Sequence, residues 1–229
     1  MSRIAIIAAI PGELKPLVAN GTWCRSESRA PGPTVWTGSL NGHEAVAVAG
    51  GIGAAAAASA VDVALLNGTA DALISYGWAG AITCAVKPPD AFGISEVVDH
   101  ATGERFATRN SEGLRLITLD HVAGYYEKRP LAEAHQAVLV DMEAAAVARF
   151  AAENSIPFYC FKSISDGYTD RLPDLNRFIS EGRLRMPAFV AYAAIRPIYW
   201  PSLVRLAGNS NRAAANLARL LSKSLPAKL

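Results

Sequence analysis

The sequence predicts an α/β protein, specifically a three-layer α/β/α sandwich with a central mixed sheet. Short β-branched runs alternate with alanine-rich stretches that are long enough for helices, a pattern typical of a sheet flanked by helices. Hydrophobic residues make up 51% of the 229 residues and charged residues 18%. The chain therefore has enough apolar material for a sizeable core, which excludes disorder as a description of the whole.

Four buried strands are expected in the first half of the chain, at residues 3–10, 35–40, 44–49 and 72–76. The second and third form a hairpin, because the Asn41-Gly42 dipeptide between them readily adopts positive φ. Residues 50–53 (GGIG) open an alanine-rich helix that continues to about Asn67, and Gly68 is its stop. The fourth strand leads into residues 77–80 (GWAG).

The second half continues the alternation. Further strands are expected at residues 93–98, 105–108, 114–119, 138–140 and 158–164. Helices are expected at residues 141–153 and 175–184, and Pro187, Pro197 and Pro201 are expected to break the segment after them. Because no linker or repeat interrupts the chain, residues 1–185 are expected to form one catalytic domain, and residues 186–229 a basic, aromatic extension packed on it.

The net charge of +2 conceals an uneven distribution. Residues 182–229 carry eight basic side chains and no acidic one, so the rest of the chain carries a charge of −6. A basic tail favours an anionic surface, and charge alone allows nucleic acid or a membrane face. The apolar run 186–195 is too short to span a bilayer. Residues 205–222 have helical spacing and form either a closing helix packed on the domain or an interfacial element, with Tyr199 and Trp200 at headgroup level.

The N-terminal apolar run is short and leads into Pro11-Gly12-Glu13, which is not the pattern of a secretory signal. Cys24, Cys84 and Cys160 are widely separated and fit reduced thiols. These features predict a cytoplasmic protein, with peripheral contact at the inner membrane face as the alternative that the tail leaves open. No metal is expected, because the four histidines lack ligand-like spacing.

Polar groups follow four of the expected strands, where loops carry function in such sheets: Glu13, residues 50–53, residues 142–143 and residues 165–166. Glu143 lies in the first turn of its expected helix, so it either complements the helix dipole or accepts hydrogen bonds from sugar hydroxyls. Asp166 follows a nearly uncharged run, and partial burial would raise its pKa and suit it to donate a proton. The glycine loop could present backbone N–H groups to phosphate or water.

Four segments occur in a characteristic order: residues 4–13 (IAIIAAIPGE), 50–53 (GGIG), 140–146 (VDMEAAA) and 163–166 (SISD). They resemble the signature blocks of the purine nucleoside phosphorylase superfamily, on its methylthioadenosine/S-adenosylhomocysteine nucleosidase branch. The likeness covers roughly residues 3–185. The extension and the compact middle look more like the hopanoid-associated nucleoside phosphorylases. The resemblance implies a phosphorylase/hydrolase-like fold and cleavage of an N-glycosidic bond.

By position, the resemblance implies roles for individual residues. Asp166 would protonate N7 of the purine and accept from the exocyclic amino group, which favours adenine. Glu143 would bind ribose hydroxyls, Met142 would pack against the sugar, and Glu13 would orient or deprotonate a water. The further substrate contacts that it implies are Gly53, Ser165, Val122 and Ala123. A positioned acid of this kind contributes about 10²–10⁴-fold to the rate.

The sequence leaves open whether the nucleophile is phosphate or water. The segment Gly51-Ile52-Gly53 could hold phosphate or water, but phosphate also needs an arginine, for which Arg105, Arg109 and Arg129 are candidates. Glu13 is expected beside the same place and would repel phosphate. The hopanoid-type resemblance alone tips the preference weakly to phosphorolysis, so no cofactor is expected beyond inorganic phosphate as a co-substrate. Trp78 stands where a serine-containing turn is usual, and it either reshapes the anion site or fills the core.

Three functions are in play as hypotheses. The first is release of adenine from a lipid-linked 5′-modified adenosine, adenosylhopane in hopanoid biosynthesis. The second is an ordinary methylthioadenosine/S-adenosylhomocysteine nucleosidase. The third is a catalytically idle protein that binds a nucleoside or lipid-nucleoside, which the joint presence of Glu13, Glu143 and Asp166 argues against. All three imply a small-molecule or lipid-linked partner and no nucleic acid, and the resemblance implies a homo-oligomer.

Overall fold

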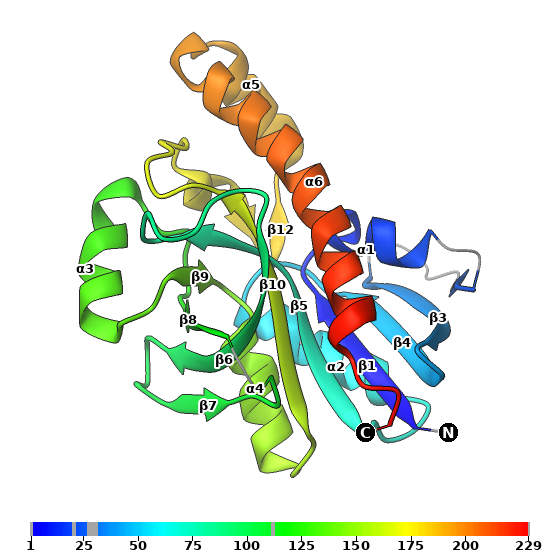
Figure 1. Cartoon of the computed structure of the whole chain (residues 1–229). Helices are drawn as coiled ribbons and strands as arrows, with labels where there is room; N and C mark the ends of the chain where they lie inside the picture. Colours follow the sequence, from blue (N-terminus) through cyan, green and yellow to red (C-terminus); the bar gives the residue numbers. More distant parts are fainter. Residues whose placement is uncertain (1, 20–21, 27–31, 111–112, 229) are drawn as a thin grey trace.

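The structure, a computed structural model, describes residues 2–19, 22–26, 32–110 and 113–228. Within these residues, ten strands form one mixed sheet, and two short strands form a separate hairpin (Figure 1). The strands are β1 (Arg3–Ala8), β2 (Cys24–Arg25), β3 (Thr34–Leu40), β4 (His43–Ala49), β5 (Ala72–Ala81), β6 (Ala91–Asp99), β7 (Arg105–Ala107), β8 (Leu114–Thr118), β9 (Leu139–Asp141), β10 (Phe158–Asp166), β11 (Ile179–Ser180) and β12 (Arg183–Leu184).

The helices of the described residues flank this sheet or extend beyond it. The α-helices are α1 (Pro11–Val18), α2 (Ala54–Leu65), α3 (Tyr125–His135), α4 (Ala144–Glu153), α5 (Met186–Ala194) and α6 (Trp200–Ser224). Two short 3₁₀ helices, η1 (Leu175–Phe178) and η2 (Pro197–Tyr199), precede β11 and α6. Helices α2 and α4 pack together on one face of the sheet, while α1 and α6 pack together on the other (Figure 1). The expected three-layer α/β/α sandwich is confirmed.

The sheet is mixed, and one half of it curls. Strand β1 lies between β4 and β5 and is parallel to both. Strand β5 also pairs with β9 and β10, and β10 pairs with β6, so β5, β9, β8, β6 and β10 close into a small barrel. The remaining strands, β4, β3 and β2, extend from β1 as an open wing. This closure, which periodicity alone does not predict, brings the end of β10 beside the ends of β5 and β9.

Two buried cores lie on opposite sides of the sheet. Alternate residues of β1 point to opposite faces: Ala5 and Ile7 join the core under α2 and α4, whereas Ile4 and Ile6 join the core under α1 and α6. A strand covered by helices on both faces must be apolar at every position, which explains the unbroken apolar run at the start of the sequence.

The expected hairpin is confirmed. Strands β3 and β4 are antiparallel, with Leu40 opposite His43, and the turn residues Asn41 and Gly42 have φ of 51° and 85°. Two consecutive residues at positive φ match the right-handed twist of the flanking strands, which is why an Asn-Gly pair predicts this turn.

Three expectations for local structure are wrong. The strand expected to end at residue 76 continues through residues 77–80 to Ala81, because β10 and β9 pair with this part of β5. Residues 175–184 are not a helix: after η1 the chain forms the β11–β12 hairpin, whose turn residues Glu181 and Gly182 have φ of 51° and 72°. The expected helix 141–153 begins only at Ala144.

Helix α3 and the prolines of the extension also differ from expectation. Helix α3 was not expected, because it has few apolar residues and Pro130 inside it, and Lys128 is its one buried residue. Pro187 and Pro201 lie in the first turns of α5 and α6 and so begin these helices instead of breaking them. Proline is tolerated there because a first-turn N–H has no partner within its helix.

The long helix α6 has two halves with different surroundings. Its second half packs on β10 and α1, where Ala214, Leu217 and Leu221 are buried. Its first half projects beyond the sheet together with α5, at the top of Figure 1. We call residues 186–206, which comprise α5, η2 and the start of α6, the apolar arm.

We expect Leu217→Ala to lower the free energy of unfolding by about 2–5 kcal/mol, because it leaves a cavity between α6 and β10. Val204→Ala, on the same helix but 72% exposed, should change it by less than about 0.5 kcal/mol. Urea unfolding followed by circular dichroism measures both values. Equal losses for the two variants would contradict the division of α6 into a packed and a projecting half.

Candidate active site

A cavity of about 190 Å³ lies where β1, β5, β9 and β10 end. The barrel closure makes these strand ends meet, so residues far apart in the sequence form one wall. Most of the residues singled out from the sequence line this cavity: Glu13, Ile52, Val122, Ala123, Met142, Glu143, Ser165 and Asp166. Gly51 and Gly53 are not among its lining residues.

Glu13 lies in the first turn of α1, and backbone N–H groups hold its carboxyl group. Its Oε2 accepts from the N–H groups of Ala9 and Ile10, at 2.8 and 3.0 Å, and its Oε1 accepts from the N–H of Trp78 at 2.7 Å. Only glycine fits at position 77, since a Cβ there would lie 2.6 Å from Oε1. Burial raises the pKa of Glu13 although these three donors oppose the change. The carboxyl group is therefore fixed in position and poised to take up a proton.

Glu143 occupies the N-cap position of α4 and not the first turn that the sequence indicated. Its Oε1 accepts from the N–H of Gly53 at 2.7 Å, and its Oε2 lies 3.3 Å from the N–H of Met142. Burial, together with the charge of Asp141, raises the pKa of Glu143 to about 7. Near neutral pH this carboxyl group is therefore partly protonated.

Asp141 ends β9 and forms a buried ion pair. Its Oδ2 lies 2.8 Å from Nζ of Lys162, and both side chains are almost completely buried. Asp141 also accepts from the hydroxyl of Thr118 and from the N–H of Ala144. Burial lowers the pKa of Lys162, but the acidic groups around it, Asp141 foremost, together raise the pKa by more, so it lies above its ordinary value. Lys162 was missed because a lysine inside an apolar strand carries no motif.

Asp166 ends β10 in surroundings that differ from the uncharged ones expected. Nζ of Lys128, from α3, donates to Oδ2 of Asp166 at 3.0 Å and to the carbonyl of Gly167 at 2.7 Å. The hydroxyl of Ser165 lies 2.9 Å from Oδ1. Lys128 is 3% exposed, so this ammonium group is a buried part of the site. No sequence signal identified it, because the helix that carries it was itself not expected.

The glycine loop does not offer the anion site that the sequence indicated. The N–H of Gly51 donates to the carbonyl of Ala9 at 2.8 Å, and the N–H of Ile52 donates to that of Gly182 at 2.7 Å. The third donor, the N–H of Gly53, is bound by Glu143. All three donors are therefore already used by the protein, so this arrangement does not favour the phosphate or water contact expected through them, which stays a prediction.

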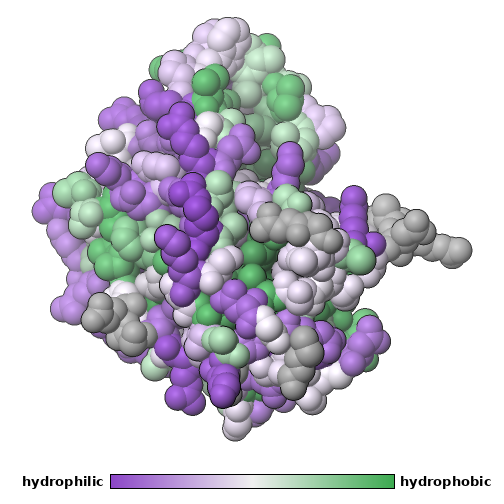
Figure 2. Space-filling view, turned by 45° about the vertical axis from the view of Figure 1, so that its right-hand side comes forward, coloured by the Kyte–Doolittle hydropathy of each residue, from purple (hydrophilic) through white to green (hydrophobic). Residues whose placement is uncertain are grey.

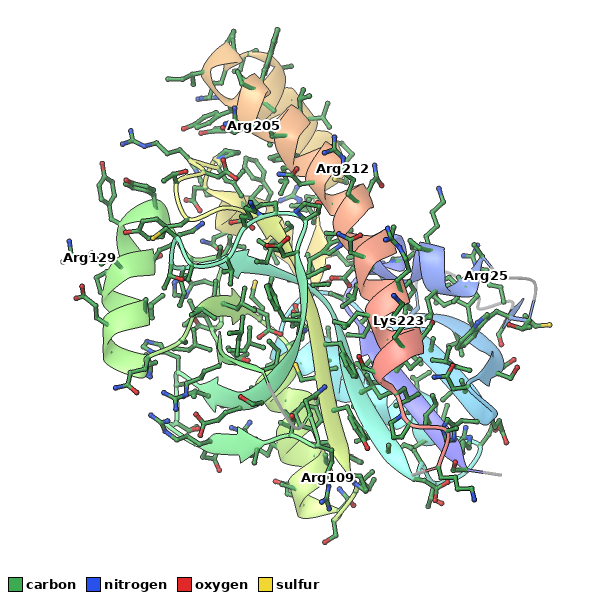
Figure 3. The ribbon with its side chains drawn as sticks, viewed as in Figure 1. Arg25, Arg109, Arg129, Arg205, Arg212 and Lys223 are labelled. Carbon is green, nitrogen blue, oxygen red and sulfur yellow. The ribbon has the colours of Figure 1, made fainter. Side chains whose placement is uncertain are left out.

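The three candidate arginines also lie elsewhere, among them Arg109 and Arg129, which Figure 3 labels. Arg129 is exposed on α3 and pairs with Glu133, and Arg105 pairs with Glu96. The backbone N–H of Arg109 bonds to Phe158, at the opposite end of β10 from Asp166. Among the described residues, the lining of the cavity includes no arginine.

Two further residues of the lining have contacts that the sequence could not supply. Trp78 lines the cavity and binds Glu13 through its backbone, and its buried indole N–H has no partner within the described residues. It is therefore available to donate to a bound molecule. The backbone N–H and carbonyl of Val122 are both bound to the side chain of Asn176, at 2.7 and 3.0 Å, so the expected backbone contact to a base falls to Ala123.

We compare the free energy of unfolding of the unsubstituted protein with that of Glu143→Gln. We expect the unsubstituted protein to lose stability relative to this variant as the pH rises from about 4.5 to about 7. The folded state holds the Glu143 proton more tightly than the unfolded state, so its stabilising effect is full below about pH 4.5 and is lost as the pH passes about 7. The change should be about 1–3 kcal/mol. Urea unfolding across this range measures it, and Glu133→Gln, on the surface of α3, should show no such trend. A flat difference for Glu143→Gln would contradict the raised pKa.

Solved structures with this fold include several nucleosidases. The 5′-methylthioadenosine/S-adenosylhomocysteine nucleosidase of Helicobacter pylori aligns with a TM-score of 0.74 and 16% identity, over 98% of this chain and 97% of that chain. The futalosine hydrolase of the same organism gives the same values. The S-adenosylhomocysteine nucleosidase of Streptococcus pyogenes aligns with a TM-score of 0.72 and 20% identity, over 98% of each chain. At these identities the likeness shows the fold.

The family is established by the sequence match. No curated protein matches this chain. The family model described as "Phosphorylase superfamily" matches residues 3–138 and 125–190, which together cover most of the chain and all the strands that end at the cavity. The chain therefore belongs to the phosphorylase superfamily of nucleoside phosphorylases and nucleosidases, and it is an enzyme that acts on an N-glycosidic bond.

Proposed function

We propose that this enzyme hydrolyses the N-glycosidic bond of a 5′-modified adenosine and releases adenine. The observation that carries the proposal is the meeting of three carboxyl groups, those of Glu13, Glu143 and Asp166, around one small cavity. Cleavage of this bond creates positive charge on the sugar and a need for a proton on the base. Carboxyl groups on different sides of the substrate serve both needs.

Asp166 is the group for the base. Adenine is a poor leaving group as an anion, so N7 must receive a proton while the bond between C1′ and N9 breaks. Lys128 and Ser165 hold the two oxygens of the Asp166 carboxyl from opposite sides, which fixes its direction. One oxygen can pass a proton to N7 and the other can accept from the exocyclic amino group. A purine with an oxygen in that place offers no such donor, and this favours adenine.

Glu143 and Met142 are the groups for the sugar. A carboxylate that is fixed by the N–H of Gly53 can accept hydrogen bonds from ribose hydroxyls and stabilise the developing positive charge. Because its pKa is about 7, the ionised fraction grows as the pH rises through neutrality. Met142, its neighbour in the lining, supplies an apolar contact for the ring.

Water is the better-supported nucleophile. The backbone N–H groups of the glycine loop are occupied, no arginine lines the cavity within the described residues, and the carboxyl groups there would repel phosphate. The preference for phosphate rested only on the hopanoid-type resemblance, and we now propose water in its place. In the proposed step, a water oxygen bonds to C1′ and gives its proton to Glu13, the bond from C1′ to N9 breaks, and N7 takes the proton of the protonated form of Asp166, which is left as a carboxylate paired with Lys128. The products are the free sugar and neutral adenine.

For the 5′ substituent, a large apolar group such as that of adenosylhopane remains our first candidate. Ile52 lines the cavity and is bound through its N–H to Gly182 in the β11–β12 hairpin. The chain passes from this hairpin directly into the apolar arm at Met186. One wall of the cavity is therefore linked through the chain to the apolar arm, whose exposed side chains could take a hydrocarbon.

A methylthio or homocysteine substituent is the second candidate. The neighbouring structures from H. pylori and S. pyogenes are named for these substrates, and their fold is that of this chain. The base and sugar chemistry of the site is the same for both candidates. The choice between them depends on whether a long apolar 5′ group raises or lowers the rate.

We expect Asp166→Asn to lower kcat for adenine release by about 10²–10⁴-fold, because the amide cannot donate a carboxyl proton to N7. Glu133→Gln, a carboxyl-to-amide change on the surface of α3, should leave kcat unchanged. The assay offers 5′-methylthioadenosine and a 5′-alkyl adenosine with a long chain, and free adenine is measured by chromatography.

An unchanged kcat in Asp166→Asn would overturn the role of Asp166. If the unsubstituted enzyme released no adenine from either substrate, the proposed function itself would fail, and a different nucleoside would be the substrate. Faster turnover of the long-chain compound would support the first candidate for the 5′ group, and its rejection would support the second.

A further inference from the structure

The apolar arm exposes a concentration of large hydrophobic side chains. Of the eight large hydrophobic residues that are exposed in the described part of the chain, six belong to the arm: Met186, Val190, Ile195, Ile198, Trp200 and Val204. Ile198 is 82% exposed and Val204 is 72% exposed. In the space-filling view, green side chains gather at the top of the molecule, over the arm (Figure 2). An apolar patch of this kind on a projecting element marks an interaction site.

The exposure is not a result of a loosely folded segment. Within the arm, the indole N–H of Trp200 donates to the carbonyl of Ala193 at 2.9 Å, which ties α6 to α5. Tyr192 packs against Phe178 at 5.1 Å between ring centroids, and the guanidinium of Arg196 lies over the Tyr192 ring at 3.8 Å. The arm therefore shares a small aromatic core with η1 and presents the hydrophobic residues named above outward.

The charge around the arm has one sign. From residue 182 to the end of the sequence there are eight basic side chains and no acidic one. Arg205 lies on the arm, and Arg212 lies about two helical turns further along α6, where the helix reaches the sheet (Figure 3). The acidic group in contact is Asp170, 3.7 Å from Arg205. An apolar tip with arginines along its sides complements a surface that is both anionic and able to accept hydrocarbon.

Other occupants fit this surface less well. A second copy of the arm would bring arginines against arginines, with no acidic side chain on the arm to compensate. Nucleic acid would satisfy the arginines but leave Ile198 and Val204 in water. None of the helices in the described residues has an apolar stretch long enough to cross a bilayer. Contact in the plane of a membrane surface satisfies both the charge and the apolar residues.

We propose that the apolar arm docks on an anionic lipid surface, with its hydrophobic side chains inserted at the level of the headgroups. This proposal concerns binding and stands apart from the proposed reaction. It has a consequence for access to the site, because a hollow lined by Tyr125, Leu172 and Ile198 adjoins the arm, and a second hollow shares Tyr125 and Leu172 with it and reaches Asp166. Docking would place the outer end of this path at the membrane surface.

The test is co-sedimentation of the full chain with vesicles of phosphatidylcholine, either alone or mixed with phosphatidylglycerol. We expect phosphatidylglycerol to raise the bound fraction at least about tenfold, and added salt to reduce it, because the arginines are attracted to the anionic headgroups. Ile198→Ser combined with Val204→Ser should abolish the binding. Leu66→Ser, at a residue that is 76% exposed away from the arm, is the matched control and should bind normally.

The charge contribution has its own matched pair. Arg205→Gln combined with Arg212→Gln should lower binding to anionic vesicles at least about tenfold. Arg109→Gln combined with Arg129→Gln removes the same charge from surfaces away from the arm and should have little effect (Figure 3). Thermal unfolding of every variant verifies that it is folded.

Three outcomes would overturn the proposal. They are equal binding to neutral and anionic vesicles, binding that survives the changes at Ile198 and Val204, and loss of binding in the control pairs to the same degree as in the arm variants. If light scattering without lipid showed a dimer that the Ile198 and Val204 changes dissociate, a second copy would be the occupant of the arm, and the proposal would be wrong.

Discussion

The buried ion pair between Asp141 and Lys162 is the constraint on which the site depends. Glu13 and Asp141 are buried and Glu143 is half-buried near the strand ends, and several carboxylates cannot share a low-dielectric space without a compensating cation. Lys162, in the middle of β10, provides that cation below the cavity, and its charge lowers the pKa of both Glu13 and Glu143 against the effect of burial. The pair also links the end of β9, where α4 begins, to β10.

The way in which the backbone donors are used decides what the cavity can bind. An N–H group that faces an empty cavity attracts anions, whereas one that already binds a carboxylate does not. Here the N–H groups of Ala9, Ile10 and Trp78 hold Glu13, and that of Gly53 holds Glu143. The protein has thus supplied its own anions at the place where a phosphate would lie. This arrangement fits a neutral nucleophile, and it is the main reason for preferring water.

Local sequence patterns predicted the elements that local forces determine, and they failed where distant contacts decide. The Asn41-Gly42 turn and the ends of β1 and β10, near which Glu13 and Asp166 lie, were readable, because turn geometry and strand periodicity depend on neighbouring residues. The role of Lys128 was not readable, because Lys128 lies 38 positions before Asp166 in the chain, on a helix whose other residues are not buried. The same holds for the contact of Ile52 with Gly182, since nothing near either residue indicates the other.

The most direct test of the account is the origin of the oxygen on the released sugar. The enzyme is incubated with 5′-methylthioadenosine or the long-chain 5′-alkyl adenosine in water enriched in ¹⁸O, with and without inorganic phosphate, and the sugar product is analysed by mass spectrometry. We predict a free sugar that carries ¹⁸O at C1′, at the same rate with and without phosphate. A sugar 1-phosphate without label from water, formed only when phosphate is present, would contradict the assignment of water as the nucleophile.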